Sequence, residues 1–358
     1  MFEPRCAKTL IGSLPHTDPE EAVRLVMEHL DEIPIFPELP RRGLLEEMIG
    51  SHTQGLPGLV VDREKNRLYI DRGRDLADEL ASFYERVMEA ERTGNLDSFA
   101  IDAEHLSGIG PATVAMERKV KEMGRPFPLV KVHVPGPVTF QLGLEDHEGR
   151  QLYYDETFAD VLLRQIEMQA RWLVRRFRPY GERVLIFLDE AALAAFGSSG
   201  YLGVLREDVV ERLGLVVRAI KTEPGTLVGI HVCGGTDWPM VMEAGFDMLN
   251  FDAFSYSRAF LAYSREIRRF LDDGGLIAWG IVPSSHRVDD TSAEELAGSL
   301  LEMVDQLAAA GPLGREVILA RSVLTPSCGL GTLTVERAKR ALELLDELAS
   351  HLQPMARS

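Results

Sequence analysis

The sequence predicts a (β/α)8 barrel, a closed ring of eight parallel strands with helices around it. Short apolar runs alternate with amphipathic stretches along all 358 residues, which is typical of repeated βα units. Eight runs have the length of strands, at 8–11, 34–36, 129–134, 184–188, 227–231, 248–251, 276–280 and 316–320. Polar residues, glycines or prolines follow these runs, at the ends where a barrel carries its chemistry. A doubly wound open sheet is the alternative, but no G-x-G-x-x-G motif follows the first run.

Amphipathic helices are predicted after most of the strands. The stretch at 156–177 shows the pattern clearly, because one broad face carries Phe158, Val161, Leu162, Ile166, Ala170, Leu173 and Phe177. The other predicted helices span 19–30, 201–221, 238–243, 257–271, 292–309 and 335–352.

An insertion at 40–125 separates the second and third strands. Within it, alternation over 58–71 predicts a hairpin that turns near 64–66, and helices are expected at about 75–93 and 111–123. We expect residues 1–358 to form a single barrel domain that includes this insertion.

Composition limits the classes of function. Hydrophobic residues make up 45% and charged residues 27% of the chain, as in soluble globular proteins. A formal charge of −17 argues against nucleic acid and anionic membranes as partners. Three cysteines do not make a disulfide framework, and neither a leader peptide nor a membrane-spanning run is recognisable. We therefore expect a cytoplasmic protein with reduced thiols.

A candidate metal site lies at the end of the run 227–231. His231 and Cys233 are two residues apart on an extended segment, so they project to the same side. Cys328 lies in a Gly- and Pro-rich turn after the eighth predicted strand, and could reach the same ion. Three such ligands with one open position are typical of a catalytic zinc. The alternative is a buried cysteine that packs like a small apolar residue beside a hydrogen-bonded histidine.

Two further residues bear on this site. Asp252 ends the sixth predicted strand and is a candidate fourth ligand, although a lone aspartate there is more commonly a helix cap or an ion-pair partner. Cys6 precedes the first strand, at the opposite end of the barrel, and is interpreted as a packing residue.

The ligand set favours one kind of chemistry. Two thiolates make a zinc ion electron-rich and a mediocre activator of water, but suit it to holding a substrate thiol as thiolate. Alkyl transfer to sulfur is therefore favoured over hydrolysis. Asp189 could accept hydrogen bonds from a substrate ammonium, and Ser13 could bind a carboxylate, although pairing with a basic residue and a turn role are the alternatives.

Six motifs occur in order along the chain: I-G-S-L-P at 11–15, P-G-P-V-T at 135–139, L-D-E-A at 188–191, H-V-C at 231–233, F-D-M-L-N-F-D at 246–252 and T-P-S-C-G-L at 325–330. Together they resemble the catalytic C-terminal barrel of cobalamin-independent methionine synthase, in the superfamily of uroporphyrinogen decarboxylase and the corrinoid/coenzyme M methyltransferases. The resemblance covers most of the chain. It implies zinc on His231, Cys233 and Cys328, and substrate contacts at Gly12, Ser13 and Asp189.

The chain departs from that family in several places. The family's fourth ligand is a glutamate, where this chain has the shorter Asp252. The aromatic segment near the folate is replaced by 140–143, which has no tryptophan, and we expect no counterpart of the folate-associated N-terminal barrel, because the family's core starts by residue 8. The family's proton-donating histidine matches His286 only with a one-residue slip. Glu38 is the candidate for the family's glutamate contact to the homocysteine amino group.

The resulting expectation is a zinc-dependent S-methyltransferase that methylates a small thiol, foremost homocysteine to give methionine. The expected donor is methylcobalamin or a corrinoid protein rather than methyltetrahydrofolate. A coenzyme M-type methyltransferase is one alternative. Another is a uroporphyrinogen decarboxylase-like enzyme, for which Arg41 and Arg42 are poor substitutes for its N-terminal arginines. A third is a non-catalytic corrinoid- or thiol-binding subunit.

Overall fold

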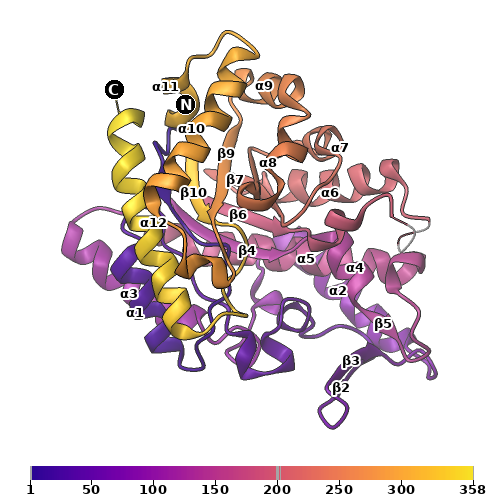
Figure 1. Cartoon of the computed structure of the whole chain (residues 1–358). Helices are drawn as coiled ribbons and strands as arrows, with labels where there is room; N and C mark the ends of the chain where they lie inside the picture. The colour runs from indigo at the N-terminus through magenta and orange to yellow at the C-terminus, as the bar shows by residue number, and fades with distance from the viewer. Residues whose placement is uncertain (1, 199–200, 202, 358) are drawn as a thin grey trace.

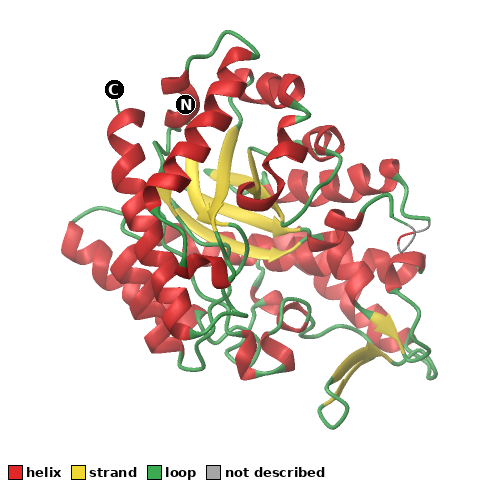
Figure 2. Ribbon diagram, viewed as in Figure 1, coloured by secondary structure: helices red, strands yellow, loops and turns green. Residues whose placement is uncertain are grey.

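The computed structural model describes residues 2–198, 201 and 203–357. Its centre is a sheet of seven parallel strands in the order β1-β10-β9-β8-β7-β6-β4. The strands are β1 (Ala7–Lys8), β4 (Val130–Pro135), β6 (Val184–Asp189), β7 (Thr226–Val232), β8 (Met248–Asp252), β9 (Leu276–Val282) and β10 (Ser322–Pro326). The sheet curls on itself and helices surround it (Figures 1 and 2). This is the TIM-barrel-like α/β fold that the sequence predicted.

The predicted second strand, at 34–36, lies at the eighth position of the barrel. Ile35 forms a single parallel bridge with Lys131 of β4. On its other side, Glu38 forms a parallel bridge with Ser13, just beyond β1. Prolines at positions 34 and 37 lack a backbone N–H and keep the segment from forming a regular ladder. The segment nevertheless lies between the two edges of the curled sheet.

The prediction of a strand at 316–320 is wrong. These residues belong to helix α11 (Arg315–Ala320), and the last barrel strand is β10. A short apolar run fits a buried helix as well as a strand. The sequence pattern did not reveal β10 as a strand, because Ser322 and Thr325 are polar although they are fully buried.

The remaining helices follow the predicted pattern closely. They are α1 (Pro19–His29), α5 (Glu156–Phe177), α6 (Arg206–Ile220), α7 (Trp238–Glu243), α10 (Ala293–Ala309) and α12 (Val335–Ala356). The single helix predicted at 257–271 is two helices, α8 (Ala253–Leu261) and α9 (Ser264–Asp272). The helix predicted from residue 201 begins only at Arg206, and residue 202 lies outside the described residues. A short helix that was not predicted, α4 (Pro137–Gly143), follows β4.

Short 3-10 turns complete the connections. They are η1 (Pro40–Arg42), η2 (Leu44–Glu46), η3 (Gly50–His52), η4 (Asp97–Phe99), η5 (Leu152–Tyr154), η6 (Arg178–Tyr180), η7 (Ala191–Ala195) and η9 (His286–Asp289).

The predicted hairpin and both helices of the insertion are present. Strands β2 (Leu59–Asp62) and β3 (Arg67–Ile70) pair antiparallel, and Asn66 adopts a positive φ of 49° at their turn. The short strand β5 (Glu145–Asp146) joins β3, and the hairpin projects from the body of the protein (Figure 1). Helix α2 is Ala77–Thr93 and α3 is Ile109–Met123, which packs against α1.

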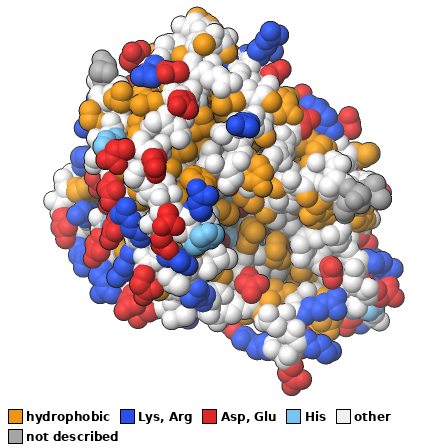
Figure 3. Space-filling view, viewed as in Figure 1, with side chains coloured by type: hydrophobic (Ala, Val, Ile, Leu, Met, Phe, Trp, Pro, Cys, Tyr) orange, Lys and Arg blue, Asp and Glu red, His pale blue; other side chains and the backbone are white. Residues whose placement is uncertain are grey.

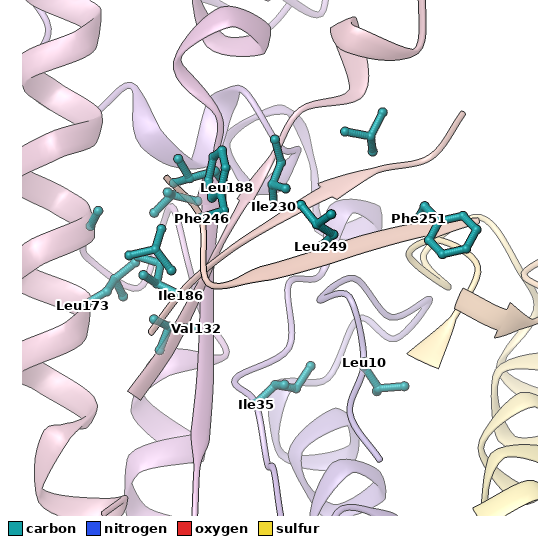
Figure 4. Close-up of a cluster of buried hydrophobic side chains, with 14 of the residues drawn as sticks. Leu10, Ile35, Val132, Leu173, Ile186, Leu188, Ile230, Phe246, Leu249 and Phe251 are labelled. Atoms are coloured by element: carbon teal, nitrogen blue, oxygen red, sulfur yellow. The ribbon is translucent and has the colours of Figure 1, made fainter. Parts of the chain in front are cut away.

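Apolar side chains fill the space between the sheet and the helices. Figure 4 shows part of this layer, in which Val132, Ile186, Leu188, Ile230 and Leu249 lie near Leu173 and Phe246. A smaller cluster, including Leu129, Leu185, Phe187 and Met248, fills the inside of the barrel. Burial on both faces explains why the strands read as continuous apolar runs.

Acidic and basic side chains are interspersed on the face shown in Figure 3, with apolar side chains exposed among them. In the described part of the chain, no helix is long and apolar enough to cross a membrane.

Candidate metal centre and substrate pocket

The inward-facing side chains change from apolar to polar along the strands. Residues two apart share a face, so the interior positions of β6 run from Leu185 and Phe187 to Asp189. The same step of two leads to Lys131 and His133 on β4, His231 on β7 and Asn250 on β8. The polar groups therefore gather at the carboxyl ends of the strands, above the apolar cluster that fills the inside of the barrel.

Three of the predicted ligands meet there. Ligand atoms of His231, Cys233 and Cys328 all lie within 4.8 Å of one another. His231 is nearly fully buried at the end of β7, and Cys233 follows that strand directly. The loop of Cys328 is anchored from both sides, because Ser327 N donates to Val282 O (2.8 Å) and Leu330 N donates to Ser13 O (2.9 Å).

The imidazole of His231 is oriented by Asn250. The Asn250 Nδ2 group donates to Ala278 O and to Thr325 Oγ1, both at 2.9 Å, so its Oδ1 faces the Nδ1 of His231 as an acceptor. His231 Nε2 is buried and has no hydrogen-bond partner among the described residues. Burial lowers the pKa of His231 to about 4, which leaves the ring neutral at physiological pH. A neutral imidazole with a free Nε2 lone pair is what a metal ion requires.

The two thiols form a pair. The hydrogen bond from Cys328 lowers the pKa of Cys233 to about 7. That same interaction with Cys233, together with burial, raises the pKa of Cys328. One thiolate beside one thiol and a neutral imidazole, all with soft or borderline donor atoms, fits a zinc ion, which would deprotonate the second thiol on binding.

The third cysteine lies away from this group, as predicted. Cys6 is fully buried and its Sγ lies 3.5 Å from Leu319 O. Burial raises its pKa to about 12, so it stays a thiol that packs in the core.

Asp252 does not belong to the cluster of three. Its Oδ1 accepts a hydrogen bond from Ser255 N (2.8 Å), which makes it the N-cap of α8. The structure thus gives Asp252 the cap role that the sequence left open.

A cavity of about 330 Å³ opens beside the three ligands. It is lined by His231, Cys233, Cys328, Ile11, Ser13, Glu38, Asp189 and Ala191 on the barrel side, and by Pro40, Arg41, Glu46, Glu47, Met48, Gly329, Gly331 and Thr332 around the mouth. The structure therefore brings Ser13, Glu38 and Asp189 to one pocket with the ligands.

A buried lysine lies near two of the carboxyl groups of this pocket, those of Asp189 and Glu38. Lys131 is fully buried; its Nζ donates to Ile11 O (2.5 Å) and lies 4.5 Å from the centroid of the Phe187 ring. Burial lowers the pKa of Lys131 to about 8, although Asp189 and Glu38 act in the opposite direction. Burial raises the pKa of Asp189, which Lys131 partly offsets, and its Oδ1 has no partner among the described residues.

Ser13 lines the wall of the cavity, and Gly12 lies behind it against His133. A Cβ at Gly12 would lie 2.6 Å from His133 Nε2, so only glycine fits there. Ser13 Oγ accepts a hydrogen bond from Gly331 N (3.3 Å), which ties this wall to the loop of Cys328.

No protein-family model matches the sequence, and no curated protein matches it. Solved structures do. One is a B12-independent methionine synthase from Shewanella sp. W3-18-1 in complex with selenomethionine, which is 14% identical, with 97% of each chain covered and a TM-score of 0.57. Another is a candidate vitamin-B12-independent methionine synthase from Listeria monocytogenes, which is 15% identical, with 97% of this chain and 98% of that chain covered and a TM-score of 0.55.

The chain has the fold of these methionine synthases. The fold that the ordered motifs implied is therefore confirmed over nearly the whole chain. At 14–15% sequence identity, the similarity supports the fold and nothing beyond it.

Among the candidates, Gly12 and Asp252 do not line this cavity, and neither does His286. His286 is exposed in η9. The family's histidine matched His286 only with a one-residue slip, which already weakened this assignment.

Sequence reasoning also missed three inward-facing residues. Asn250, Lys131 and His133 each interrupt an apolar strand with a polar side chain, and Asn250 is in register with His231. A polar residue in the middle of a fully buried strand is unusual enough to have marked all three.

Proposed function

We propose that this protein is a zinc-dependent S-methyltransferase that methylates the thiol of homocysteine. The observation that carries the proposal is the meeting of His231, Cys233 and Cys328 in a pocket that also contains Asp189, Glu38 and Ser13. A zinc-ligand set beside groups that can bind an ammonium and a carboxylate is complementary to an amino acid with a thiol side chain. The fold shared with methionine synthases supports the same assignment.

Zinc held by these residues would keep the substrate thiol as a thiolate at neutral pH. The residues of the chain prepare that step: Asn250 holds His231 with Nε2 free, and the loop anchored on Ser13 presents Cys328. In the transfer, a sulfur lone pair forms the new S–CH3 bond. The bond from the methyl group to the donor breaks, and its electron pair stays on the donor.

The charges of the pocket favour a substrate with an ammonium group. Asp189, Glu38 and Glu47 contribute carboxyl groups to its lining, and Glu46 contributes one that is paired with Arg42. Arg41 is the basic lining residue, but its guanidinium donates to the carbonyl oxygens of Leu333 (2.5 Å) and Gly331 (3.3 Å). An α-amino group is complementary to this surface, whereas the sulfonate of coenzyme M is not. This ranks homocysteine above coenzyme M as acceptor.

The size of the cavity bears on the donor. About 330 Å³ is at the lower end for ligand pockets and suits a small amino acid. A corrinoid or a folate would have to present its methyl group from outside, through the mouth. Because the aromatic segment that lies near the folate in the resembling family is replaced by 140–143, we propose methylcobalamin, delivered free or on a corrinoid protein, as the donor, with methyltetrahydrofolate as the alternative.

The decarboxylase alternative loses support. Arg41 is held by backbone carbonyls, and Arg42 is paired with Glu46. Neither arginine is available for the carboxylates of a tetrapyrrole.

The test is a transfer assay on the purified full chain. Zinc is measured, and methionine is quantified after incubation of L-homocysteine with methylcobalamin or with methyltetrahydrofolate; coenzyme M replaces homocysteine in a parallel set. We expect about one zinc per chain, and methionine from methylcobalamin. Cys328→Ser should lose both zinc and turnover, and Cys6→Ser should keep both.

Two results would contradict the proposal. Absence of zinc from the parent protein, or full zinc content and turnover in Cys328→Ser, would remove the metal site. Binding of zinc and homocysteine without turnover on any donor would instead identify a non-catalytic subunit.

A further inference from the structure

A buried histidine lies behind the Glu38 side of the pocket. His133 of β4 is fully buried, and its ring stacks on Phe36 with a centroid distance of 4.5 Å. Its Nε2 lies 3.4 Å from Glu38 Oε1. Neither ring nitrogen has a hydrogen bond of standard geometry to any described residue. Burying a polar ring without hydrogen-bond partners costs free energy. The position of the Glu38 carboxylate beside this ring therefore needs an explanation.

The surrounding backbone is built to allow this contact. A Cβ at Gly12 would lie 2.6 Å from His133 Nε2, so the glycine leaves room for the ring. Glu38 N donates to Gly12 O (3.2 Å), and Leu14 N donates to Glu38 O (2.9 Å). The backbone of Glu38 is thus held from both sides, and only the direction of its carboxyl group remains to be set.

The electrostatic environment keeps that carboxyl group charged. Burial raises the pKa of Glu38, but His133, His52 and Lys131 together bring it below its ordinary value. Burial lowers the pKa of His133 itself. Near neutral pH the pair is therefore a carboxylate beside a neutral imidazole, which can donate an N–H to it.

His52 adds to this arrangement. It is fully buried, and its Nδ1 lies 2.8 Å from Gln169 Oε1, so the ring carries its proton on Nδ1. Its Nε2 has no partner among the described residues. Burial lowers the pKa of His52 to about 4, so its ring is neutral near neutral pH; Glu38 raises this pKa and His133 lowers it, which places the three groups in one buried cluster.

We infer that His133 is a positioning residue that aims the Glu38 carboxylate at the ammonium group of the thiol substrate. His133 does not line the pocket, whereas Glu38 does, so it acts through Glu38. The inference rests on the proposed function, because it takes the substrate to be an amino-acid thiol. It makes the buried histidine a determinant of selectivity for acceptors with a free amino group.

The test compares two ligands on zinc-loaded full-length protein. L-homocysteine carries the amino group, and 4-mercaptobutyrate is the same thiol acid without it. In His133→Phe the ring can still stack on Phe36 but has no N–H, whereas His133→Gln keeps a donor. Calorimetry should show that His133→Phe weakens L-homocysteine binding about tenfold, as expected for the loss of a polar N–H contact to a charged carboxylate. Binding of 4-mercaptobutyrate should be unchanged, and His133→Gln should restore part of the loss.

Gly12→Ala provides a second variant if His133→Phe does not fold, because it pushes the ring away from Glu38 and should cause the same selective loss. Unchanged zinc content shows that the metal centre is intact in each variant. Equal weakening of both ligands, or none, overturns the inference and leaves the proposed function standing. Failure of the parent protein to bind L-homocysteine overturns both.

Discussion

Asn250 fixes the tautomer of His231 through the hydrogen bond between its Oδ1 and His231 Nδ1. The amide cannot be turned around, because its Nδ2 already donates to Ala278 O and Thr325 Oγ1. The Nδ1 of His231 must therefore be the protonated nitrogen, and Nε2 keeps its lone pair for a metal. This contact makes the buried polar residue of β8 a part of the metal centre.

Replacing Asn250 with Leu should weaken zinc binding without removing a ligand. Loss of such a supporting hydrogen bond typically costs about 10- to 100-fold in metal affinity. Competition with a chromophoric chelator measures this. Asn66→Gly, at the positive-φ turn of the hairpin, is the control and should bind zinc like the parent. Parent-like affinity in Asn250→Leu would show that the ring is held by packing alone.

The metal-free protein should be alkylated at Cys233 well before Cys6. The hydrogen bond from Cys328 lowers the pKa of Cys233 to about 7, whereas burial raises that of Cys6 to about 12. Since the thiolate is the reactive form, the iodoacetamide rate at Cys233 should rise with pH and level off above about pH 7. Mass spectrometry of the labelled peptides gives both rates.

The pairing of the thiols has a direct test in the same experiment. Cys328→Ala removes the hydrogen bond, so the midpoint of the pH profile should move upward, toward the ordinary cysteine value of 9.0. Added zinc should protect Cys233 in the parent protein. An unshifted midpoint would show that Cys328 does not act on Cys233.

Asp252 should prove dispensable for the metal. Because its Oδ1 caps α8, Asp252→Asn should keep full zinc content and lose only a few tenths of a kcal/mol of unfolding free energy. Asp252→Ala should cost about 1 kcal/mol in urea unfolding and also keep the zinc. Asp237→Ala, which removes the equivalent cap of α7, is the matched comparison. Loss of zinc in Asp252→Asn alone would restore Asp252 as the fourth ligand.

Much of this site could be predicted from local sequence, and the reasons are physical. The step of two along a strand places His231 and Cys233 together, and barrel topology brings the loop of Cys328 to the same end. Local sequence does not show which of several possible partners a side chain contacts in the folded protein. Asp252 could cap or coordinate, and only the position of Ser255 N shows that it caps.

The misassigned strand has a similar cause. After Glu316 the run at 316–320 is continuously apolar and fits a helix or a strand, while β10 carries one buried polar residue on each face, Ser322 and Thr325. Those two residues accept hydrogen bonds from Trp279 Nε1 and Asn250 Nδ2, respectively, partners far away in the sequence. From local sequence alone, a buried polar residue suggests a loop, because its hydrogen-bond partner far along the chain is not yet known.

Glu190 should give the protein a stability that falls as pH rises toward 7. Its buried carboxyl group accepts hydrogen bonds from Val138 N, Thr139 N (both 2.9 Å) and Thr139 Oγ1 (2.6 Å), at the start of α4. Burial nevertheless raises its pKa from 4.5 to about 7. Between these values the folded protein holds a proton that the unfolded chain has lost. The contribution of this proton to stability is therefore complete below about pH 4.5 and lost as pH rises through about 7.

Urea unfolding at a series of pH values from 4.5 to 8 tests this against two variants. In Glu190→Gln the titrating group is gone, so the unfolding free energy should depend less on pH over this window than in the parent, although it is lower overall because an amide NH2 faces backbone N–H donors. Glu64→Gln, at the exposed hairpin turn, should keep the pH dependence of the parent. If Glu190→Gln and the parent show the same slope, Glu190 is ionised throughout the range. Its hydrogen bonds to the start of α4 would then outweigh its burial.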